Sequence, residues 1–293
     1  MSVQMVGDVS IAKVVDLAGA GFVPGQLLPD LDPAVLDANA GWLKPTHWDS
    51  EKGRFVMSIH SWVVRNGRQT ILIDTCLGND KNRPNRPFWH QRQGDFLDRL
   101  RAAGVAPEEV THVFCTHLHV DHVGWNTRLR NGRWVPTFPH AKYLFGKTEY
   151  AHWAEEAKKP GSNVGDGAFE DSVVPIVEAK QAVMVDKDYD LDRAITLEEF
   201  PGHTPGSIVL GLQSKGKEAH FIGDIMHHPI QVYRPDWSSQ FCWDPKLSAK
   251  SRRRVLELCA ERGSLMLPAH FSGSGCGHIH PHEGNFRIDW ARE

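Results

Sequence analysis

Short apolar runs that each end at an aspartate or a histidine recur along this chain of 293 residues. Ile71-Leu72-Ile73 leads into Asp74, and similar runs lead into Asp224 and His270. Runs of this length are typical of buried strands, and ligands collect at the carboxyl ends of strands in α/β sheets. The pattern therefore predicts an α/β fold in which these polar side chains lie at the ends of strands.

Turn signals and hydrophobic periodicity predict several further elements. Asn66-Gly67 between two β-rich runs predicts a hairpin, and the apolar spacing within residues 247–262 predicts a helix. Residues 78–94 are polar and rich in proline, asparagine and arginine, which predicts a loop. Residues 20–53 contain several prolines, so we expect a mostly irregular N-terminal arm or lid. We expect one domain over residues 1–293.

Composition excludes several classes of protein. The chain has 33 lysines and arginines against 36 aspartates and glutamates, without a basic stripe, so no nucleic-acid partner is expected. No apolar run approaches the ~18 residues of a membrane span, and Met1–Ser10 lacks the features of a signal peptide. The five cysteines are scattered and form no CxxC, which favours a reducing compartment. We therefore expect a cytoplasmic protein without a membrane partner.

The run from His117 to His122 places four metal-capable side chains within six residues. On extended backbone His117 and His119 point to the same side. A helix start after them would turn Asp121 and His122 toward a second point nearby, so one cluster can serve two adjacent ions. A surface loop that is merely rich in histidine is the alternative, but three histidines and an aspartate in this order favour a metal site.

Three later residues complete a ligand set for two metals. His203 lies in a Gly/Pro-rich loop after a predicted strand, while Asp224 and His270 end apolar runs. Each of the three is a weak signal alone. A pair of ions about 3.5–4 Å apart requires roughly six ligands and usually a bridging carboxylate, and the seven side chains together supply that number.

The HxHxDH motif of residues 117–122, followed by His203, Asp224 and His270, resembles the metallo-β-lactamase superfamily over about residues 55–272. The resemblance implies an αββα sandwich, in which two mixed β-sheets pack face to face with helices outside. It also implies two divalent metal ions, Zn²⁺ foremost, with Fe, Mn or Co as alternatives. In this family the first metal would be held by His117, His119 and His203, the second by Asp121, His122 and His270, and Asp224 would bridge them. Asp74 matches the family's strand-end aspartate, which orients a liganding histidine from behind.

Departures from subgroup patterns narrow the implied activity. Zinc β-lactamases of the commonest type carry cysteine at the position of Asp224, and flavodiiron relatives carry an acidic residue at the position of His119. The run that continues into Trp125-Asn126 resembles the lactonase, glyoxalase-II-like and organophosphate-hydrolase branch. This resemblance implies a dinuclear hydrolase of a lactone, an ester or an aryl organophosphate. Asp121 would be its catalytic residue and would hold a metal-bridging hydroxide in position.

Other functions stay open at this point. A mononuclear iron oxygenase similar to persulfide dioxygenases would use His117, His203 and Asp224 as a facial triad, and hydrolytic dehalogenation of an aromatic compound is a further alternative. A non-catalytic, metal-stabilised binding module is disfavoured because no cysteine occupies a ligand position. A GxSxG nucleophile elbow is absent from the sequence, and Cys115 is expected to be a buried strand residue.

Aromatic residues in predicted loops are candidates for the wall of a substrate pocket, although core packing is the alternative for each tryptophan. The candidates are Phe88, Trp89, Trp125, Trp237, Phe241 and Trp243. An aromatic wall favours a small-molecule substrate with an apolar or aromatic part. Irregular N-terminal arms in this branch often form dimers, so a homodimer stays open.

Overall fold

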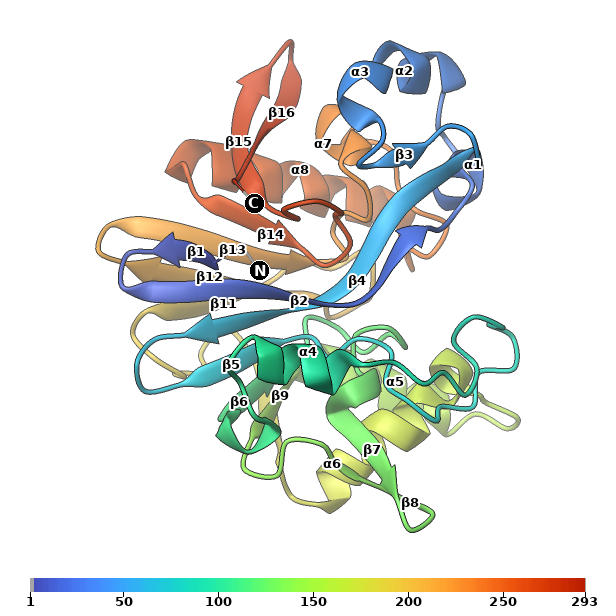
Figure 1. Ribbon diagram of the computed structural model, residues 1–293, viewed down its shortest axis with the longest axis vertical. Helices are drawn as coiled ribbons and strands as arrows, with labels where there is room; N and C mark the ends of the chain where they lie inside the picture. Colours follow the sequence, from blue (N-terminus) through green and yellow to red (C-terminus); the bar gives the residue numbers. More distant parts are fainter. Residues whose placement is uncertain (1–2, 293) are drawn as a thin grey trace. The chain divides into compact units, whose positions relative to one another are not determined.

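The structure is a computed structural model that describes residues 3–292. The chain forms two compact units: unit 1 contains residues 3–16 and 59–189, and unit 2 contains residues 17–58 and 190–292. Two of the three boundaries between the units fall inside strands, β2 (Val9–Ala20) and β4 (Arg54–Arg65), which therefore belong to both units, and the third follows Tyr189. Both strands are labelled in Figure 1. The single domain expected over residues 1–293 stays a prediction.

The main sheet of unit 1 is mixed. Among the described residues its strand order is β1-β2-β4-β5-β6-β9-β10, and β3 pairs with the unit 2 part of β4. The β4–β5 hairpin at Asn66-Gly67 is antiparallel, as predicted, whereas β5, β6, β9 and β10 run parallel to one another. The other strands are β1 (Val3–Val6), β3 (Trp48–Asp49), β5 (Thr70–Ile73), β6 (His112–Phe114), β9 (Lys142–Gly146) and β10 (Ala182–Val185).

Helices and a small hairpin complete unit 1. Its hydrophobic core joins Phe96 and Leu100 of a helix to Val113 of β6 and Tyr143 of β9. The predicted loop over 78–94 is confirmed, since no helix or strand is assigned within these described residues. The remaining elements are α4 (Phe96–Ala102), η1 (Pro107–Glu109), η2 (Gly124–Asn126), β7 (Thr127–Arg130), β8 (Arg133–Pro136), α5 (Lys147–Ala157), η3 (Val164–Gly167), η4 (Phe169–Val173) and α6 (Val174–Glu178).

Unit 2 contains the second mixed sheet. Its strand order among the described residues is β11-β12-β13-β14-β15-β16, in which only the β13–β14 pair is parallel. The strands are β11 (Ile195–Glu199), β12 (Ile208–Ser214), β13 (Lys217–Gly223), β14 (Leu265–Pro268), β15 (Gly277–His282) and β16 (Asn285–Trp290). The predicted helix over 247–262 is confirmed as α8 (Pro245–Arg262), which is capped at its start by the Asp244 carboxylate and ends at Gly263 in the left-handed conformation.

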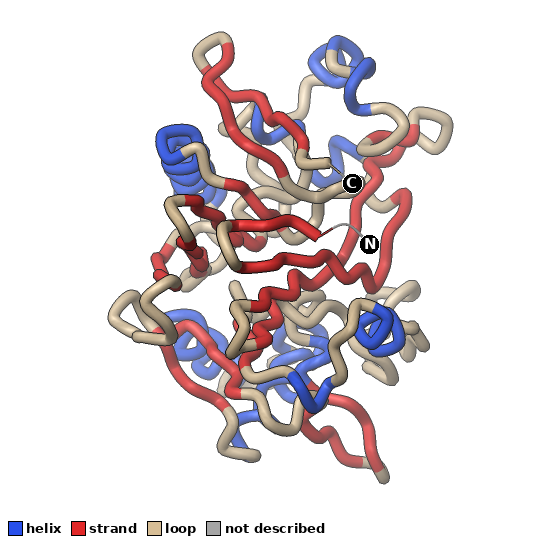
Figure 2. The backbone as a smooth tube through the Cα atoms, turned by 60° about the vertical axis from the view of Figure 1, so that its left-hand side comes forward, coloured by secondary structure: helices blue, strands red, loops and turns tan. Residues whose placement is uncertain are grey.

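Residues 20–53 are more ordered than expected. They form three short helices, α1 (Pro24–Leu27), α2 (Pro33–Ala38) and α3 (Ala40–Leu43). A further short helix of unit 2, α7 (Ile230–Tyr233), comes from a later part of the chain. Two of these helices begin at a proline, because the fixed φ of proline suits the first helical position. Their apolar side chains pack with Trp48, Phe55 and Trp237 in a core cluster of unit 2. Figure 2 distinguishes helices, strands and loops along the backbone by colour.

Parallel strand pairs determine where polar side chains gather in each unit. In unit 1, β5 and β6 end side by side, because Ile73 pairs with Phe114. In unit 2, β13 and β14 are parallel, and β11 also runs in their direction because β12 is antiparallel to both β11 and β13. The segments that follow these strand ends carry every residue of the predicted metal set.

Within residues 3–292, no helix combines the length and the apolar character that crossing a lipid bilayer requires.

Candidate metal centre

The unit 1 cluster lies just beyond the ends of β5 and β6. The chain after β6 contains His117, His119, Asp121 and His122, and their rings and carboxylate are close together. The ring centroid of His117 is 4.6 Å from that of His119 and 4.0 Å from that of His122. Asp121 Oδ1 lies 3.8 Å from His122 Nε2. The four predicted motif residues of unit 1 therefore form one group.

Asp74 supports this group from the end of β5. Its Oδ2 lies 2.8 Å from His122 Nδ1, and its Oδ1 accepts a hydrogen bond of 2.8 Å from the backbone N–H of Thr116. Because Nδ1 of His122 faces Asp74, Nε2 of the ring is directed away from that carboxylate. This is the arrangement in which an outer carboxylate fixes the tautomer of a metal-binding histidine.

The backbone of the motif is held by two glycine contacts with the segment after β5. The Gly124 N–H donates to the carbonyl of Cys76 at 2.8 Å. A Cβ at Gly124 would lie 1.9 Å from the carbonyl oxygen of Leu77, and a Cβ at Gly78 would lie 2.6 Å from the carbonyl oxygen of Gly124. Only residues without a side chain allow the two segments to approach this closely.

Glu149 and Trp153, both on α5, were not predicted from the sequence. Glu149 is buried, and its Oε1 accepts hydrogen bonds from the backbone N–H of Leu118 at 3.0 Å and from Trp153 Nε1 at 2.6 Å. The Trp153 ring meets His119 edge-on at a centroid distance of 5.6 Å. Glu149 thus anchors the backbone between the two histidines, and Trp153 supplies an aromatic neighbour to one of them.

The unit 2 cluster contains the other three predicted ligands. His203 follows β11, Asp224 follows β13 and His270 follows β14, and all three are buried. His203 Nε2 lies 3.4 Å from Asp224 Oδ2, and His270 Nε2 lies 3.0 Å from Asp224 Oδ1. The carboxylate of Asp224 is therefore the centre of this cluster.

The loop that carries His203 is packed tightly against the start of α8. A Cβ at Gly202, whose φ is +132°, would lie 2.2 Å from the backbone nitrogen of Ser248. The carbonyl of His203 accepts a hydrogen bond of 2.9 Å from the N–H of Trp243. These contacts fix the backbone from which the His203 ring extends.

His227 is a third histidine in contact with Asp224, and the sequence reading did not single it out. Its Nε2 lies 3.2 Å from Asp224 Oδ2. The ligand atoms of His203, Asp224 and His227 all lie within 4.8 Å of one another. Burial lowers the pKa of His227, although the neighbouring Asp224 carboxylate acts in the opposite direction.

The donor set of each unit fits a divalent transition metal. Imidazole nitrogens and carboxylate oxygens are the ligands that zinc and similar ions prefer, and the cysteines near these residues do not replace any of them. Outer ring nitrogens contact protein groups, as in metal sites whose histidines are oriented from behind. His122 Nδ1 faces Asp74, His117 Nδ1 faces the Thr116 hydroxyl at 3.1 Å, and His270 Nδ1 lies 3.1 Å from the carbonyl of Ser58.

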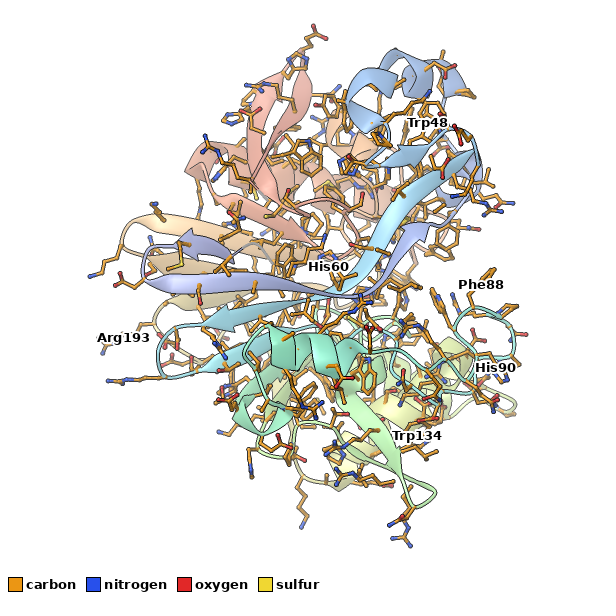
Figure 3. All side chains as sticks on the ribbon, viewed as in Figure 1. Trp48, His60, Phe88, His90, Trp134 and Arg193 are labelled. Atoms are coloured by element: carbon orange, nitrogen blue, oxygen red, sulfur yellow. The ribbon has the colours of Figure 1, made fainter. Side chains whose placement is uncertain are left out.

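The aromatic residues suggested for a pocket wall have different environments. Trp125 is buried and stacks on Phe96 at 5.8 Å in the core of unit 1, and Trp237 is buried in the core of unit 2. Phe88 is 90% exposed on the 78–94 loop (Figure 3), and Trp243 is 59% exposed. The remaining two are partly buried: Trp89 beside the core of unit 1 and Phe241 beside that of unit 2. The pocket itself stays a prediction.

Cys115 is not suited to act as a nucleophile. It is buried, and its Sγ contacts Asn126 Oδ1 at 3.8 Å. Burial raises the pKa of the Cys115 thiol well above its usual range, so the reactive thiolate is disfavoured.

The sequence model described as the metallo-beta-lactamase superfamily matches residues 54–270. The acyl-coenzyme A thioesterase MBLAC2 of Bos taurus is 26% identical over 237 residues, which cover 74% of this chain and 75% of the relative. The crystal structure of the hydrolase AbOPH is 26% identical, covers 99% of this chain and 97% of its own, and has a TM-score of 0.81.

A second solved structure extends the likeness in fold. The dizinc quorum-quenching lactonase AidC is 21% identical, covers 100% of this chain and 97% of its own, and has a TM-score of 0.79. Together with the mixed sheets of the two units, these matches confirm the predicted α/β fold class.

Proposed function

Because this chain belongs to the metallo-beta-lactamase superfamily and thus to a group of hydrolytic enzymes, we propose that it is a dinuclear metal-dependent hydrolase of a lactone, an ester or an aryl organophosphate. The observation that carries the proposal is the cluster of imidazole and carboxylate groups after the strand ends of each unit. His117, His119, Asp121 and His122 form it in unit 1, and Asp224 with its histidines forms it in unit 2.

Seven side chains would hold the two ions, most simply as Zn²⁺. The first ion would be held by His117, His119 and His203, the second by Asp121, His122 and His270, and Asp224 would be shared between them. When bound, such ions lower the pKa of water toward neutrality and polarise the oxygen of the bond to be cleaved. The side chains around the ions would position the attacking water and transfer protons.

Asp121 is the catalytic residue in this proposal. Its side chain is 17% exposed, whereas the neighbouring His122 is 1% exposed. A carboxylate that is still reached by solvent can accept a hydrogen bond from the attacking water and hold it in line with the substrate. If this carboxylate takes up the proton that the water loses during attack, it can pass that proton to the leaving oxygen.

The substrate proposed is a small molecule with an apolar or aromatic part. An aromatic ring adjoins each cluster. In unit 1 Trp153 meets His119 edge-on, and in unit 2 the ring centroid of Phe241 lies 6.4 Å from that of His227. Phe241 also meets Phe22 edge-on at 5.3 Å. Acyl compounds come first, because a relative that aligns with three quarters of this chain is called an acyl-coenzyme A thioesterase.

The test is a substrate panel on protein that has been stripped of metal and reconstituted with Zn²⁺, Mn²⁺ or Co²⁺. The panel contains an N-acyl lactone, an aryl ester, an acyl thioester, an aryl phosphotriester and a β-lactam. We expect hydrolysis of an acyl or phosphoryl compound that depends on added metal, with little cleavage of the β-lactam. His119→Ala should lower kcat/KM by more than the ~10–100-fold typical of losing an outer partner of a ligand.

His140→Ala is the matched control, because His140 is an exposed histidine of unit 1 outside the cluster. It should leave both metal content and turnover unchanged. The proposal is wrong if the reconstituted protein holds less than one ion per chain and His119→Ala hydrolyses the preferred substrate at the rate of the unsubstituted protein.

A further inference from the structure

The carboxylate of Asp224 has histidines next to both of its oxygens. His270 Nε2 lies 3.0 Å from Oδ1 and 3.2 Å from Oδ2. His203 Nε2 and His227 Nε2 lie 3.4 Å and 3.2 Å from Oδ2. His203 and His270 belong to the proposed ligand set, whereas His227 does not. The contact between His227 and Asp224 is therefore not explained by the proposed ligand set.

A second chain of polar contacts links His227 to His203 without passing through Asp224. Ser239 Oγ lies 3.3 Å from His227 Nε2 and 3.6 Å from Cys242 Sγ. Cys242 Sγ in turn contacts His203 Nδ1 at 3.9 Å. With Asp224 between the two rings, these five residues form a closed circuit. We call Ser239, Cys242 and His227 the brace.

The tautomer of His227 follows from its surroundings. Among the residues that the structure describes, no hydrogen-bond partner reaches the buried Nδ1, whereas Nε2 faces both the Asp224 carboxylate and the Ser239 hydroxyl. A neutral imidazole carries one N–H. Placing it on Nε2 satisfies the donor, whereas placing it on Nδ1 would bury a donor without an acceptor.

We propose that His227 is a positioning residue, which donates its Nε2–H to Oδ2 of Asp224 and, through the brace, holds Asp224 and His203 in a fixed mutual orientation for metal binding. This inference rests on the proposed function, because it assumes that Asp224 and His203 are ligands. If Asp224 were shared between two ions, the orientation of its carboxylate would have to stay fixed, and rotation about the Cβ–Cγ bond would disturb the binding. The hydrogen bond from His227 opposes that rotation.

The next residue offers a matched control. His228 is also fully buried, but its Nε2 lies 2.9 Å from the carbonyl oxygen of His47, and its ring stacks on Phe55 at 3.6 Å. A substitution at His228 therefore disturbs the packing of unit 2 without removing a partner of Asp224. The same change at the two positions separates a general packing effect from an effect on the ligand.

The experiment compares His227→Leu, His227→Gln and His228→Leu in the full chain. The affinity for Zn²⁺ is measured by competition with a chromophoric chelator, and the visible absorption of the Co²⁺ form reports the geometry at the metal. We expect His227→Leu to weaken the binding of at least one ion by about 10–100-fold and to change the Co²⁺ spectrum. His227→Gln, which keeps an N–H donor, should recover most of the affinity, and His228→Leu should bind both ions as the unsubstituted protein does.

The outcomes separate this inference from the proposed function. If the unsubstituted protein binds no Zn²⁺ or Co²⁺, the proposed metal centre fails and the inference fails with it. If it binds both ions and His227→Leu binds them equally well, only the inference is wrong, and an equal loss in His228→Leu would also refute it. Should His227→Leu not fold, as judged by circular dichroism, His227→Met fills a similar volume without an N–H and replaces it.

Discussion

Asp74 shows how one buried side chain can order a whole stretch of backbone. Its φ is +59°, in the left-handed region, and its N–H donates to the carbonyl of Phe114 at 2.8 Å. Its Oδ1 accepts a hydrogen bond from the Thr116 N–H, and its Oδ2 contacts both the Thr116 hydroxyl and His122 Nδ1. The end of β5 is thereby tied to the segment after β6, and this link sets the direction of the His122 ring.

Replacing this carboxylate is the prediction at the scale of single residues. In Asp74→Ala, the His122 ring loses its acceptor, so we expect metal affinity to fall by about 10–100-fold. Thermal stability should fall as well, because the buried donors of Thr116 lose their partner. Metal competition and thermal unfolding measure the two effects. Asp98→Ala removes an exposed carboxylate in the same unit and should change neither; equal metal binding in both variants would contradict the role given to Asp74.

The sequence singled out candidate site residues whose spacing is distinctive, and it gave no signal for residues whose contacts depend on folding. The close sequence spacing of His117 and His122 predicts a metal cluster, and each cluster member in unit 1 lies near another one. Glu149 and His227 have no such signal, because each reaches the cluster from a separate element. A glutamate in the first turn of a helix is common, and only the parallel pairing of β6 with β9 brings this one to the motif.

At the scale of elements, the 78–94 loop is anchored by buried charges at its base. Lys81 and Arg83 are each 1% exposed, and both form ion pairs with Asp171 of η4. Lys81 also donates to Thr127 Oγ1 at 2.6 Å, and its ammonium lies 3.7 Å from the centre of the Trp134 ring. Two cations thus share one carboxylate in the interior of unit 1. Such an arrangement fixes the loop but makes its stability sensitive to protonation.

This cluster predicts a pH dependence of folding. Burial lowers the pKa of Lys81 from 10.5 to about 7. Below pH 7 Lys81 is protonated in both the folded and the unfolded protein, so the full free-energy cost of burying its charge is present. Between about pH 7 and 10 the unfolded chain keeps a proton that the folded protein has released, so the contribution of Lys81 to stability rises with pH.

Urea unfolding at pH 7, 8, 9 and 10 measures this effect. The free energy of unfolding of Lys81→Met should rise less with pH over this range than that of the unsubstituted protein. Lys187→Met, at an exposed position of unit 1, should retain the original dependence. Parallel pH profiles for all three proteins would show that Lys81 keeps its charge in the folded state.

Elements with strong local signals were predicted, and elements that depend on packing were not. The Asn66-Gly67 turn and the apolar spacing of α8 are local features, and both elements formed as expected. The β15–β16 hairpin was not predicted, because Gly277–His282 contains histidines and a proline and buries few apolar side chains. The helices of residues 20–53 are too short for hydrophobic periodicity to show, and they are held by contacts with Trp48 and Trp237.

At the scale of the whole molecule, the two units are interleaved in sequence. Unit 1 contains residues 3–16 and 59–189, and the chain passes between the units within β2, within β4 and after Tyr189. Backbone hydrogen bonding along a strand is cooperative with its neighbours in the sheet, so melting of one unit removes residues of a strand that the other unit also uses. We infer that neither unit is a separable folding module.

A single unfolding transition is therefore expected. Far-ultraviolet circular dichroism and tryptophan fluorescence should give the same midpoint in urea, since tryptophans occur in both units, for example Trp125 and Trp237. Binding of Zn²⁺ should raise that midpoint as a whole rather than split the curve. Two separated transitions, or probe-dependent midpoints, would contradict the expectation of one domain.

The 78–94 loop also has a consequence for the evolution of such an enzyme. Its base is secured by Lys81 and Arg83 in the interior, while Phe88 at its tip is 90% exposed and contributes almost nothing to the core. Mutations at the tip therefore escape the purifying selection that acts on foldability, whereas mutations at the base do not. If the tip of the loop contacts substrates, substitutions there can change substrate specificity while the buried base of the loop stays the same.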